Sequence, residues 1–272
     1  MTTSKTLGHL TILIRGAGEM ASGIAWRLYR SGFRRLLMTE IAQPLAVRRS
    51  VSFSEAVWDL SHAVEGVTAR RIAALGEAES AWQDSTIAVL VDADCRVAPI
   101  LKPDVLVDAI LAKRNLGTHI HNAPLVIGLG PGFRAGSDVH CVVETNRGHH
   151  LGRLLTDGSA APDTGIPGEI GGHTVRRVLR APTGGVFEAR LAIGEAVNEG
   201  DLVGNVAGQG VHAGLAGMLR GLIRSGTLVR QGLKIGDIDP RGDPSYCLTI
   251  SEKARAIAGA VLEAILMKYN LP

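Results

Sequence analysis

The chain has 272 residues, enough for one large domain or two modest ones whose cores need no disulfide or metal support. Its composition is 46% hydrophobic and 20% charged with 34 glycines, which is typical of a globular protein rich in turns and excludes extensive disorder. The net charge of +3 is too small, without a concentrated basic patch, to indicate a surface for nucleic acid or for a membrane.

The cysteines and the hydropathy pattern indicate a cytoplasmic protein. Cys95, Cys141 and Cys247 show no C-x-x-C spacing, which argues against a disulfide framework and against a cysteine zinc site. The first apolar run is too short for a signal peptide, and no segment reaches the roughly 18 apolar residues of a spanning helix. We therefore expect no membrane association and no nucleic-acid partner.

The first elements form a strand, a glycine loop, a helix and a second strand. Residues 10–14 are a continuous apolar run, typical of a parallel strand that is buried on both faces. Residues 19–31 have helical periodicity, and Gly32 stands where a helix commonly ends. Residues 35–40 are a second strand that ends in a carboxylate. This order predicts a βαβ unit.

The loop in this unit has the pattern G-x-G-x-x-A, which is typical of dinucleotide binding in a Rossmann-like domain. Gly16 would allow the tight turn, Gly18 the close approach of a pyrophosphate, and Ala21 the packing of helix on strand. Glu40 stands near the roughly 20-residue offset at which a carboxylate reaches a ribose hydroxyl. We expect NAD(P) or another nucleotide here. The alternative is a Rossmann scaffold that keeps the glycines only for the turn.

Further strands and helices alternate along the first half. Residues 67–72, 86–91 and 105–110 read as strands and residues 73–82 as a helix, which predicts a mostly parallel sheet. Arg48 and Arg49 follow the second strand and could contact a ligand phosphate or lie on a solvated helix face. Because parallel sheets bind ligands beyond the carboxyl ends of their strands, Glu40, Asp92 and Asp108 are expected to converge.

Residues 124–150 contain a second glycine-rich loop. An apolar strand over residues 124–129 runs into Gly128, Gly130 and Gly132 around a proline. Glycine permits positive φ and a close approach to the backbone, so this loop could turn several N–H groups toward an anion. We expect it to lie at the same sheet edge as the first glycine loop and to share its ligand.

The segment after this loop carries the candidate catalytic groups. If residues 137–145 form a strand, Asp138, His140 and Glu144 leave the same face and could act as acid/base groups or polar ligands, with Arg147 as a further ligand contact. The alternative is a set of solvated strand residues beside a turn. His119 and His121 lack a clear third partner, so we expect no metal site.

From residue 148 onward short β-branched segments appear between glycines. Val197-x-x-Gly200 recurs as Ile223-x-x-Gly226, which suggests a pseudo-symmetric barrel-sandwich module similar to the biotinyl/lipoyl-domain family. The hairpin between the copies, residues 207–210, has no lysine, so we expect no covalent biotin or lipoate. Residues 251–268 have the apolar stripe of a helix that Ser251 could cap. We expect this helix to pack on a domain or on a partner subunit, which would make a homo-oligomer.

The expected fold class is therefore α/β, with an N-terminal Rossmann-like parallel sheet followed by a small all-β barrel-sandwich module and a C-terminal helix. The expected boundaries are residues 1–147 for the nucleotide-binding domain, 148–247 for the β-rich module and 248–272 for the helix.

Several stretches resemble a known family. RGAGEMASGIAWRL, MTEIAQPLAVRRSVSFSEAV, VDAILAKRN, APLVIGLGPGF, DVHCVVETNRGH and TGIPG are similar to the YqeB-type accessory proteins of selenium-dependent molybdenum hydroxylase systems, which are grouped with XdhC-like proteins by their Rossmann domain. The resemblance implies a maturation factor for a molybdenum hydroxylase, with that enzyme or its cofactor-assembly proteins as partners. It supplies no residue roles.

Two functions compete at this stage. The first is an accessory factor that binds a nucleotide or a molybdopterin-type cofactor, such as molybdopterin dinucleotide, in a cleft between the glycine loop and the junction with the β module. The second is an NAD(P)-dependent oxidoreductase that acts on a small substrate, with His140 as general acid/base. A structural adaptor is a third class.

Overall fold

The computed structural model describes residues 6–270, which form two compact units. The first unit takes in the described residues up to Pro44, then Phe53–Asp163, and the described residues from Ile250 onward. The second unit takes in Leu45–Ser52 and Thr164–Thr249. Residues 148–163, which we expected in the β-rich module, thus lie in the first unit, and residues 45–52 lie in the second.

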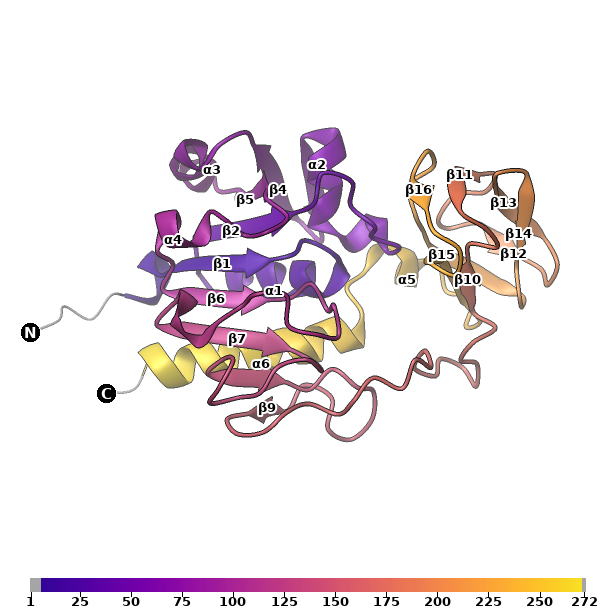
Figure 1. Cartoon of the computed structure of the whole chain (residues 1–272). Helices are drawn as coiled ribbons and strands as arrows, with labels where there is room; N and C mark the ends of the chain where they lie inside the picture. Colours follow the sequence, from indigo (N-terminus) through magenta and orange to yellow (C-terminus); the bar gives the residue numbers. More distant parts are fainter. Residues whose placement is uncertain (1–5, 271–272) are drawn as a thin grey trace, which may run out of the picture. The chain divides into compact units, whose positions relative to one another are not determined.

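The first unit is built on a nine-stranded sheet (Figure 1). Its strands are β1 (Thr11–Arg15), β2 (Arg35–Glu40), β3 (Ser61–Val64), β4 (Val67–Ile72), β5 (Ile87–Val91), β6 (Val105–Asp108), β7 (Leu125–Leu129), β8 (Cys141–Val143) and β9 (Leu154–Leu155). The order across the sheet is β3-β4-β5-β2-β1-β6-β7-β8-β9. The strands from β4 to β8 in this order pair in parallel, whereas β3 and β9 pair antiparallel at the two edges.

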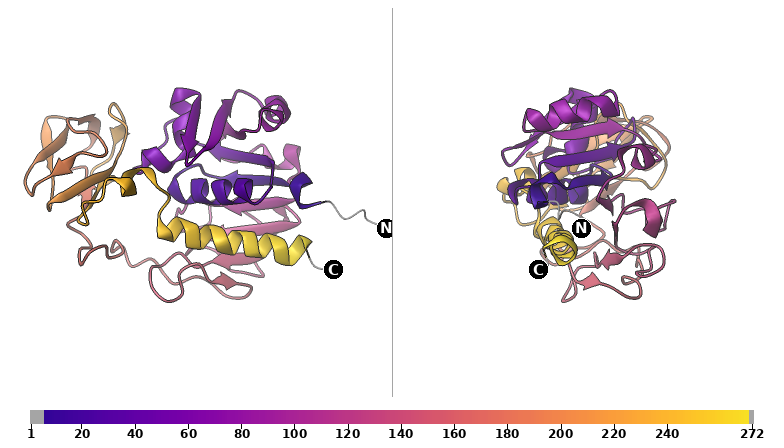
Figure 2. Two further views of the ribbon diagram at one scale, coloured as in Figure 1. Left: turned by 180° about the vertical axis from the view of Figure 1, so that it is seen from behind. Right: turned by 90° about the vertical axis from the view of Figure 1, so that its left-hand side faces the viewer.

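Helices cover both faces of this sheet. The helices of the unit are α1 (Glu19–Arg30), α2 (Ala56–Asp59), α3 (Ala78–Gln83), α4 (Ala98–Leu101) and α6 (Glu252–Tyr269), with short 3-10 turns η1 (Leu7–His9), η3 (Phe53–Glu55), η4 (Leu75–Glu77) and η5 (Ile120–Asn122). The helices α1 and α6 lie side by side on one face (Figure 2). On the other face, Trp82 of α3 packs in the core with Leu13 and Leu37, and its Nε1 donates to the Leu36 carbonyl at 2.9 Å.

The contact between α1 and α6 depends on small residues. A Cβ atom added to Gly23 of α1 would lie 2.9 Å from Ala254 Cβ of α6, so only glycine permits this approach. Ser251 caps α6 by accepting from the Ala254 N–H, as the sequence predicts, and its hydroxyl donates to the Glu19 carboxylate at 2.8 Å. The C-terminal helix is therefore an integral layer of the first unit.

The second unit consists of two four-stranded antiparallel sheets, ordered β10-β17-β15-β12 and β14-β13-β11-β16. Phe187, Val203 and Leu219 are fully buried in its core. The strands are β10 (Val178–Arg180), β11 (Gly185–Ala189), β12 (Ala196–Val197), β13 (Leu202–Val206), β14 (Gln209–His212), β15 (Gly217–Leu222), β16 (Leu228–Val229) and β17 (Lys234–Asp239), with η2 (Arg49–Val51) and α5 (Ser245–Leu248) alongside.

Buried charges link three strands of the second unit. Asp237 of β17 pairs with Arg177, just before β10, and with Arg220 of β15, and the same Arg220 reaches Asp239 at 3.1 Å. Burial by itself would raise the pKa of both carboxyl groups, but the pKa of each lies below its ordinary value. The lowering comes first from Lys234 and then from Arg220 and Arg177 at Asp237, and first from the hydrogen bonds of Arg241 at Asp239. The network fixes strand order rather than forming a binding site.

The expected fold class is wrong as stated. Most single elements match, and β2 and β4 have the predicted bounds. The sheet, however, is mixed rather than a Rossmann-like parallel sheet, because hairpins add antiparallel strands at both edges. One signal is visible in the sequence: the β3–β4 turn is Glu65-Gly66, with φ of 42° and 79°, a turn in which both residues have positive φ. The second unit is a pair of four-stranded antiparallel sheets.

The small-residue contact between α1 and α6 can be tested with two glycine-to-alanine changes. We expect Gly23→Ala to destabilise the protein by about 1–3 kcal/mol, because the new methyl group overlaps Ala254 and outweighs the gain in helix propensity. Gly259→Ala in α6, where nothing lies within 4 Å of the added Cβ, should instead be neutral or stabilising by up to about 1 kcal/mol. Urea unfolding of both variants measures the difference, and equal effects would contradict this account of the packing.

Candidate functional site

The first glycine loop is occupied by a carboxylate of the chain itself. Glu40 Oε2 accepts from the Ala17 N–H at 2.9 Å, and Oε1 accepts from the Ile41 N–H at 2.8 Å. Burial raises the pKa of Glu40, although these two hydrogen bonds oppose the rise. The residue expected to bind a ribose hydroxyl thus places negative charge at the backbone expected to bind phosphate.

Close packing accounts for two of the three small residues of this motif, Gly16 and Ala21. Gly16 has φ of +100°, and an added Cβ would lie 3.3 Å from the Ala109 carbonyl oxygen. Ala21 is fully buried in α1 against the sheet, as predicted. Gly18, which precedes α1, is the member of the motif with open space around it.

The second glycine loop is also filled by the protein. A Cβ on Gly128 would meet the Phe133 ring at 2.6 Å, one on Gly130 would meet Thr145 Oγ1 at 2.5 Å, and one on Gly132 would meet the Arg114 backbone at 2.5 Å. The Gly130 N–H is already bonded to the Val143 carbonyl at 2.8 Å. All three glycines are therefore required by contacts within the chain, and the loop needs no anion to explain it.

Two glycines of this region make a matched test of that explanation. Gly132 and Gly136 both have positive φ, 107° and 79°, but only Gly132 lacks room for a side chain. We expect Gly136→Ala to destabilise the fold by about 1–2 kcal/mol, the cost of a left-handed backbone for alanine. Gly132→Ala should cost clearly more, because the Arg114 backbone must move as well. Thermal unfolding compares them, and a Gly132→Ala variant as stable as Gly136→Ala would refute the packing role.

The predicted basic contacts are engaged elsewhere. Arg48 and Arg49 belong to the second unit, where Arg48 donates to the carbonyls of Tyr246 and Thr249 and Arg49 donates to that of Leu222 at 2.8 Å. Arg147 forms an ion pair with Glu252 at the start of α6. These three side chains help to hold their own units together.

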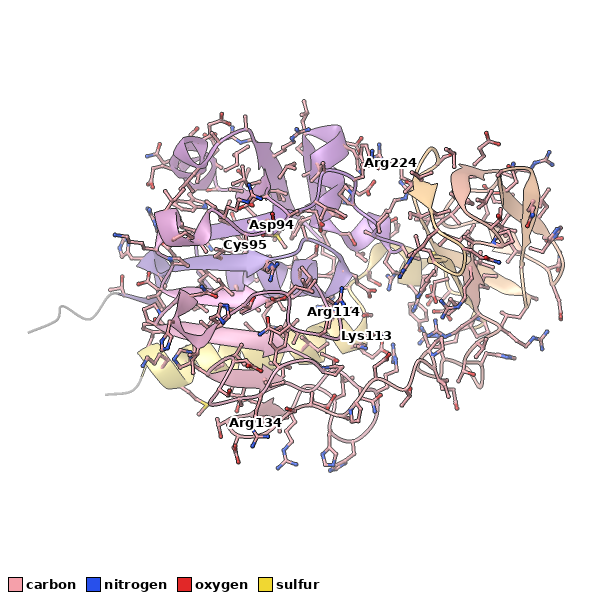
Figure 3. All side chains as sticks on the ribbon, viewed as in Figure 1. Asp94, Cys95, Lys113, Arg114, Arg134 and Arg224 are labelled. Carbon is pink, nitrogen blue, oxygen red and sulfur yellow. The ribbon has the colours of Figure 1, made fainter. Side chains whose placement is uncertain are left out.

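Polar groups do gather at the carboxyl ends of the central strands. Asp108, 1% exposed, accepts from Arg15 at 3.2 Å and from the Thr118 hydroxyl at 2.6 Å, so the end of β6 is closed by a buried ion pair. Asp92 accepts from the Val97 N–H at 2.8 Å. Figure 3 labels Asp94 and Cys95, which follow β5, and Lys113 and Arg114, which follow β6.

Cys95 at this edge is poorly suited to act as a nucleophile. Its thiol is 9% exposed, and burial raises its pKa to about 11, against smaller opposing contributions from Thr39 and Arg15. The protonated thiol is the less reactive form of cysteine. Burial raises the pKa of Cys141 and of Cys247 as well.

The three candidate catalytic residues do not share a face. The strand β8 has only three residues, so His140 stands at its amino end and Glu144 at its carboxyl end, on opposite edges of the sheet. Asp138 lies in the turn before β8 and accepts from the Arg134 N–H at 2.8 Å, while Glu144 accepts from the N–H groups of Asn146 and Ala161. The continuous strand expected over residues 137–145 is not formed, because residues 136–138 are a turn and Val139 makes only an isolated bridge to Ala135 before β8 begins at Cys141.

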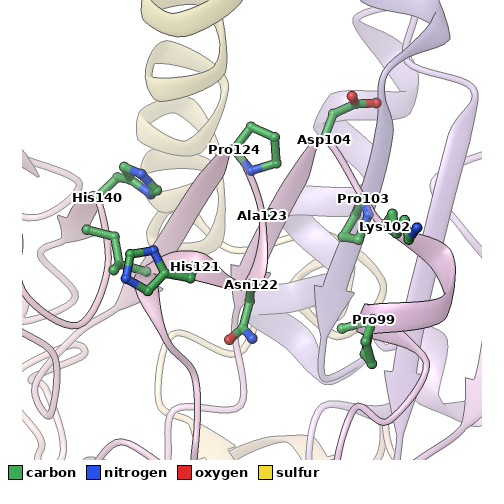
Figure 4. A pocket seen from close by; sticks show the side chains of 11 residues that line it. Pro99, Lys102, Pro103, Asp104, His121, Asn122, Ala123, Pro124 and His140 are labelled. Atoms are coloured by element: carbon green, nitrogen blue, oxygen red, sulfur yellow. The ribbon is translucent and has the colours of Figure 1, made fainter.

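His140 instead lines a cavity at the amino ends of β6, β7 and β8 (Figure 4). The cavity has a volume of about 540 Å³, within the range of small-molecule pockets. Its polar groups are Lys102, Asp104, His121, Asn122 and His140. Its apolar wall is made by Ala98, Pro99, Pro103, Ile120, Ala123 and Pro124.

The hydrogen bond of His140 fixes which nitrogen carries the proton. The Val126 N–H donates to Nδ1 at 2.9 Å, so the neutral ring carries its proton on Nε2. Partial burial, followed by the charges of Lys268 and His121, lowers the pKa of His140. At neutral pH the ring therefore presents an N–H donor and offers no free lone pair to act as a base.

This arrangement gives a definite pH dependence. Because the pKa of His140 is lowered in the folded protein, its contribution to stability is present above the unfolded value of about 6.5 and is lost as pH falls through that value toward the folded pKa. We expect NMR titration to give His140 a pKa below 6.5 and His140→Asn to lose less stability than the parent protein in this acid range. A His140 pKa at or above 6.5 would contradict the observed bond to Val126.

The cavity residues other than His140 were not identified from the sequence. His121 was seen only as half of an i, i+2 pair with His119, whose side chain instead accepts from the Asn122 N–H in a capping box. Lys102 has positive φ of 50°, which the sequence does not reveal. Within residues 6–270 there is no group of three or more His, Cys, Asp or Glu side chains that could hold a metal ion. No helix in that range is long and apolar enough to span a bilayer.

The fold and the cavity define a two-unit α/β protein with a pocket at the amino ends of three parallel strands of its first unit. In sequence the chain is 48% identical over 267 residues to the uncharacterized protein YqeB of Escherichia coli (strain K12), an alignment that covers 98% of this chain and 49% of that protein. The chain thus spans about half the length of this curated relative. The resemblance to YqeB is confirmed, whereas the relation to XdhC-like proteins is not. No family model matches the chain.

Solved structures give a distant likeness. An aspartoacylase family protein from Mesorhizobium loti is 14% identical with a TM-score of 0.28, at 84% coverage of both chains. A succinylglutamate desuccinylase/aspartoacylase from Rhodobacter sphaeroides is 15% identical with a TM-score of 0.28, at 86% coverage of both. The ectoine utilization protein EutE from Ruegeria pomeroyi is 13% identical with a TM-score of 0.25, at 84% coverage of both. Scores of this size carry no argument about activity.

The expected function is corrected accordingly. In the structure itself, the first glycine loop is occupied by Glu40 and the second by protein atoms. Maturation of a selenium-dependent molybdenum hydroxylase, Rossmann nucleotide binding and nicotinamide-dependent oxidoreduction are therefore no longer supported as the function of this chain.

Proposed function

We propose that this protein binds a small organic molecule in the cavity at the amino ends of β6, β7 and β8. The observation that carries the proposal is the hydrogen bond of His140, whose Nδ1 accepts from the Val126 N–H, so that Nε2 carries the proton of a ring that lines a cavity of about 540 Å³. A pocket with apolar walls and a few fixed polar groups is the usual form of a small-molecule site.

The surroundings hold this donor in place. Val126 lies in β7, a strand buried along its whole length, so the N–H that orients the ring is itself fixed by the sheet. The loop that closes the cavity between β6 and β7 contains η5, whose capping box ties His119 to Asn122. The Tyr269 hydroxyl of α6 donates to the Asp104 carbonyl at 2.8 Å, which anchors the C-terminal helix beside the cavity.

In this role His140 would donate a hydrogen bond to an acceptor oxygen or nitrogen of the ligand. A neutral imidazole whose lone pair is already used can polarise or position such an acceptor, but it cannot remove a proton through Nε2. The proposed role is therefore ligand positioning.

Two substitutions of His140 separate its two nitrogens. Asparagine keeps an acceptor near the Nδ1 position for the Val126 N–H and removes the donor into the cavity, whereas glutamine keeps a donor near Nε2. We expect His140→Asn to retain stability near pH 7 and to weaken ligand binding about 5- to 20-fold, the effect of one lost hydrogen bond of about 1–2 kcal/mol. His140→Gln should retain more of the affinity.

Binding can be measured by NMR with a library of small fragments, using the resonances of Lys102, His121 and His140 as reporters. Fragments that shift these resonances in the parent protein and bind less tightly to His140→Asn support the proposal. If no fragment shifts them, or if His140→Asn binds as tightly as the parent while remaining folded, the cavity is not the ligand site.

A further inference from the structure

The outer surface of the helices α1 and α6 has a groove that is separate from the cavity at His140. The groove has a volume of about 500 Å³, and Arg27 of α1 lines it on one side. The other lining residues all belong to α6, and they are Gly259, Leu262, Glu263, Leu266, Met267 and Asn270. Figure 2 shows the two helices side by side on the outside of the first unit.

The helix α6 is apolar on two sides. Val261 and Ile265 are fully buried in the first unit. Leu262 and Leu266 line the groove instead and are half-buried, and Met267 beside them is 49% exposed. A surface helix needs one apolar stripe to pack on its own domain. The second stripe of α6 therefore indicates a surface that a partner covers.

The groove also contains one cation and one anion, and their arrangement indicates which partner fits. Arg27 Nε is buried and has no hydrogen-bond partner among the described residues. Glu263 is exposed and lines the same groove. A surface with both signs of charge is complementary to itself when a two-fold axis places Arg27 of one copy beside Glu263 of the other. Charge thus favours a second copy of this chain over a partner of uniform charge.

The size of this surface predicts a weak dimer. The helix α6 has 18 residues. It is therefore about 27 Å long, and together with α1 it offers roughly 500 Å² per copy, less than the ~800 Å² per partner of a standard interface. Nothing lies within 4 Å of a Cβ added to Gly259, so this position leaves room for a side chain of the partner. We expect a dissociation constant in the micromolar range.

We propose that the groove between α1 and α6 is the interface of a homodimer. Leu262, Leu266 and Met267 of two copies pack across a two-fold axis, and Arg27 of each copy pairs with Glu263 of the other. This proposal goes beyond the proposed function, and it does not depend on any ligand of the cavity at His140.

Two charge reversals test the pairing between copies. Arg27→Glu and Glu263→Arg each replace both attractive pairs of the dimer by repulsive ones, so each variant alone should dimerise at least about tenfold more weakly than the parent. An equimolar mixture of the two variants should form a heterodimer about as tightly as the parent dimerises, because opposite charges then meet at both pairs. Glu188→Arg reverses an exposed charge of the second unit and should change nothing.

Sedimentation velocity over about 1–500 μM protein measures these equilibria, and circular dichroism checks that each variant is folded. A parent protein that stays monomeric over this range would overturn the proposal. A dimer that both reversals leave unchanged, or a mixture that dimerises no better than either variant alone, would do so as well.

Leu266→Ala keeps the test decisive if a charge reversal fails to fold, because alanine retains the helix propensity of α6. Each dimer loses two leucine side chains from its interface in this variant. We expect it to dimerise about five- to twentyfold more weakly than the parent. A Leu266→Ala variant that dimerises like the parent would show that the apolar stripe is not the interface.

Discussion

The shared direction of the central parallel strands determines which polar groups of the first unit can lie close together. Because β6, β7 and β8 run in the same direction, residues that precede them gather at one edge of the sheet and residues that follow them gather at the other. Although β8 has only three residues, His140 stands at its amino end and Glu144 at its carboxyl end. The cavity forms where Asp104, Pro124 and His140 immediately precede β6, β7 and β8. Ligands of parallel sheets usually bind at the carboxyl edge, so this position is unusual.

The carboxyl edge is closed by the protein's own groups. Glu40 takes the place that an anion would need at the first glycine loop, and the pair of Arg15 and Asp108 fills the gap between β1 and β6, where the strand order reverses. At the second loop, other protein atoms lie so close to Gly130 and Gly132 that neither position has room for a side chain. A glycine motif thus indicates that other atoms lie close to the backbone. Those atoms can belong to the protein itself as well as to a ligand.

Much of the secondary structure could be predicted from the sequence, because apolar runs and helical periodicity are local properties. The bounds of β2 and β4 and the Ser251 cap of α6 follow from such patterns. The edge hairpins were missed because β9 has only two residues and β3 is largely exposed, so neither has a strong pattern. Residues 45–52 belong to the second unit because of contacts with residues distant in sequence. The periodicity of a sequence contains no information about such contacts.

The site could be predicted only in part, for a physical reason. His140 was identified as a polar residue at the edge of a strand, but its role depends on the Val126 N–H, which reaches Nδ1 only because β7 and β8 pair in this register. That bond places the proton of the neutral ring on Nε2 and makes protonation unfavourable, since a second proton would have to displace the Val126 donor. The positive charge of Lys268 acts in the same direction from the end of the chain. A ligand acceptor at Nε2 would complete the hydrogen bonding of this ring without changing its protonation state.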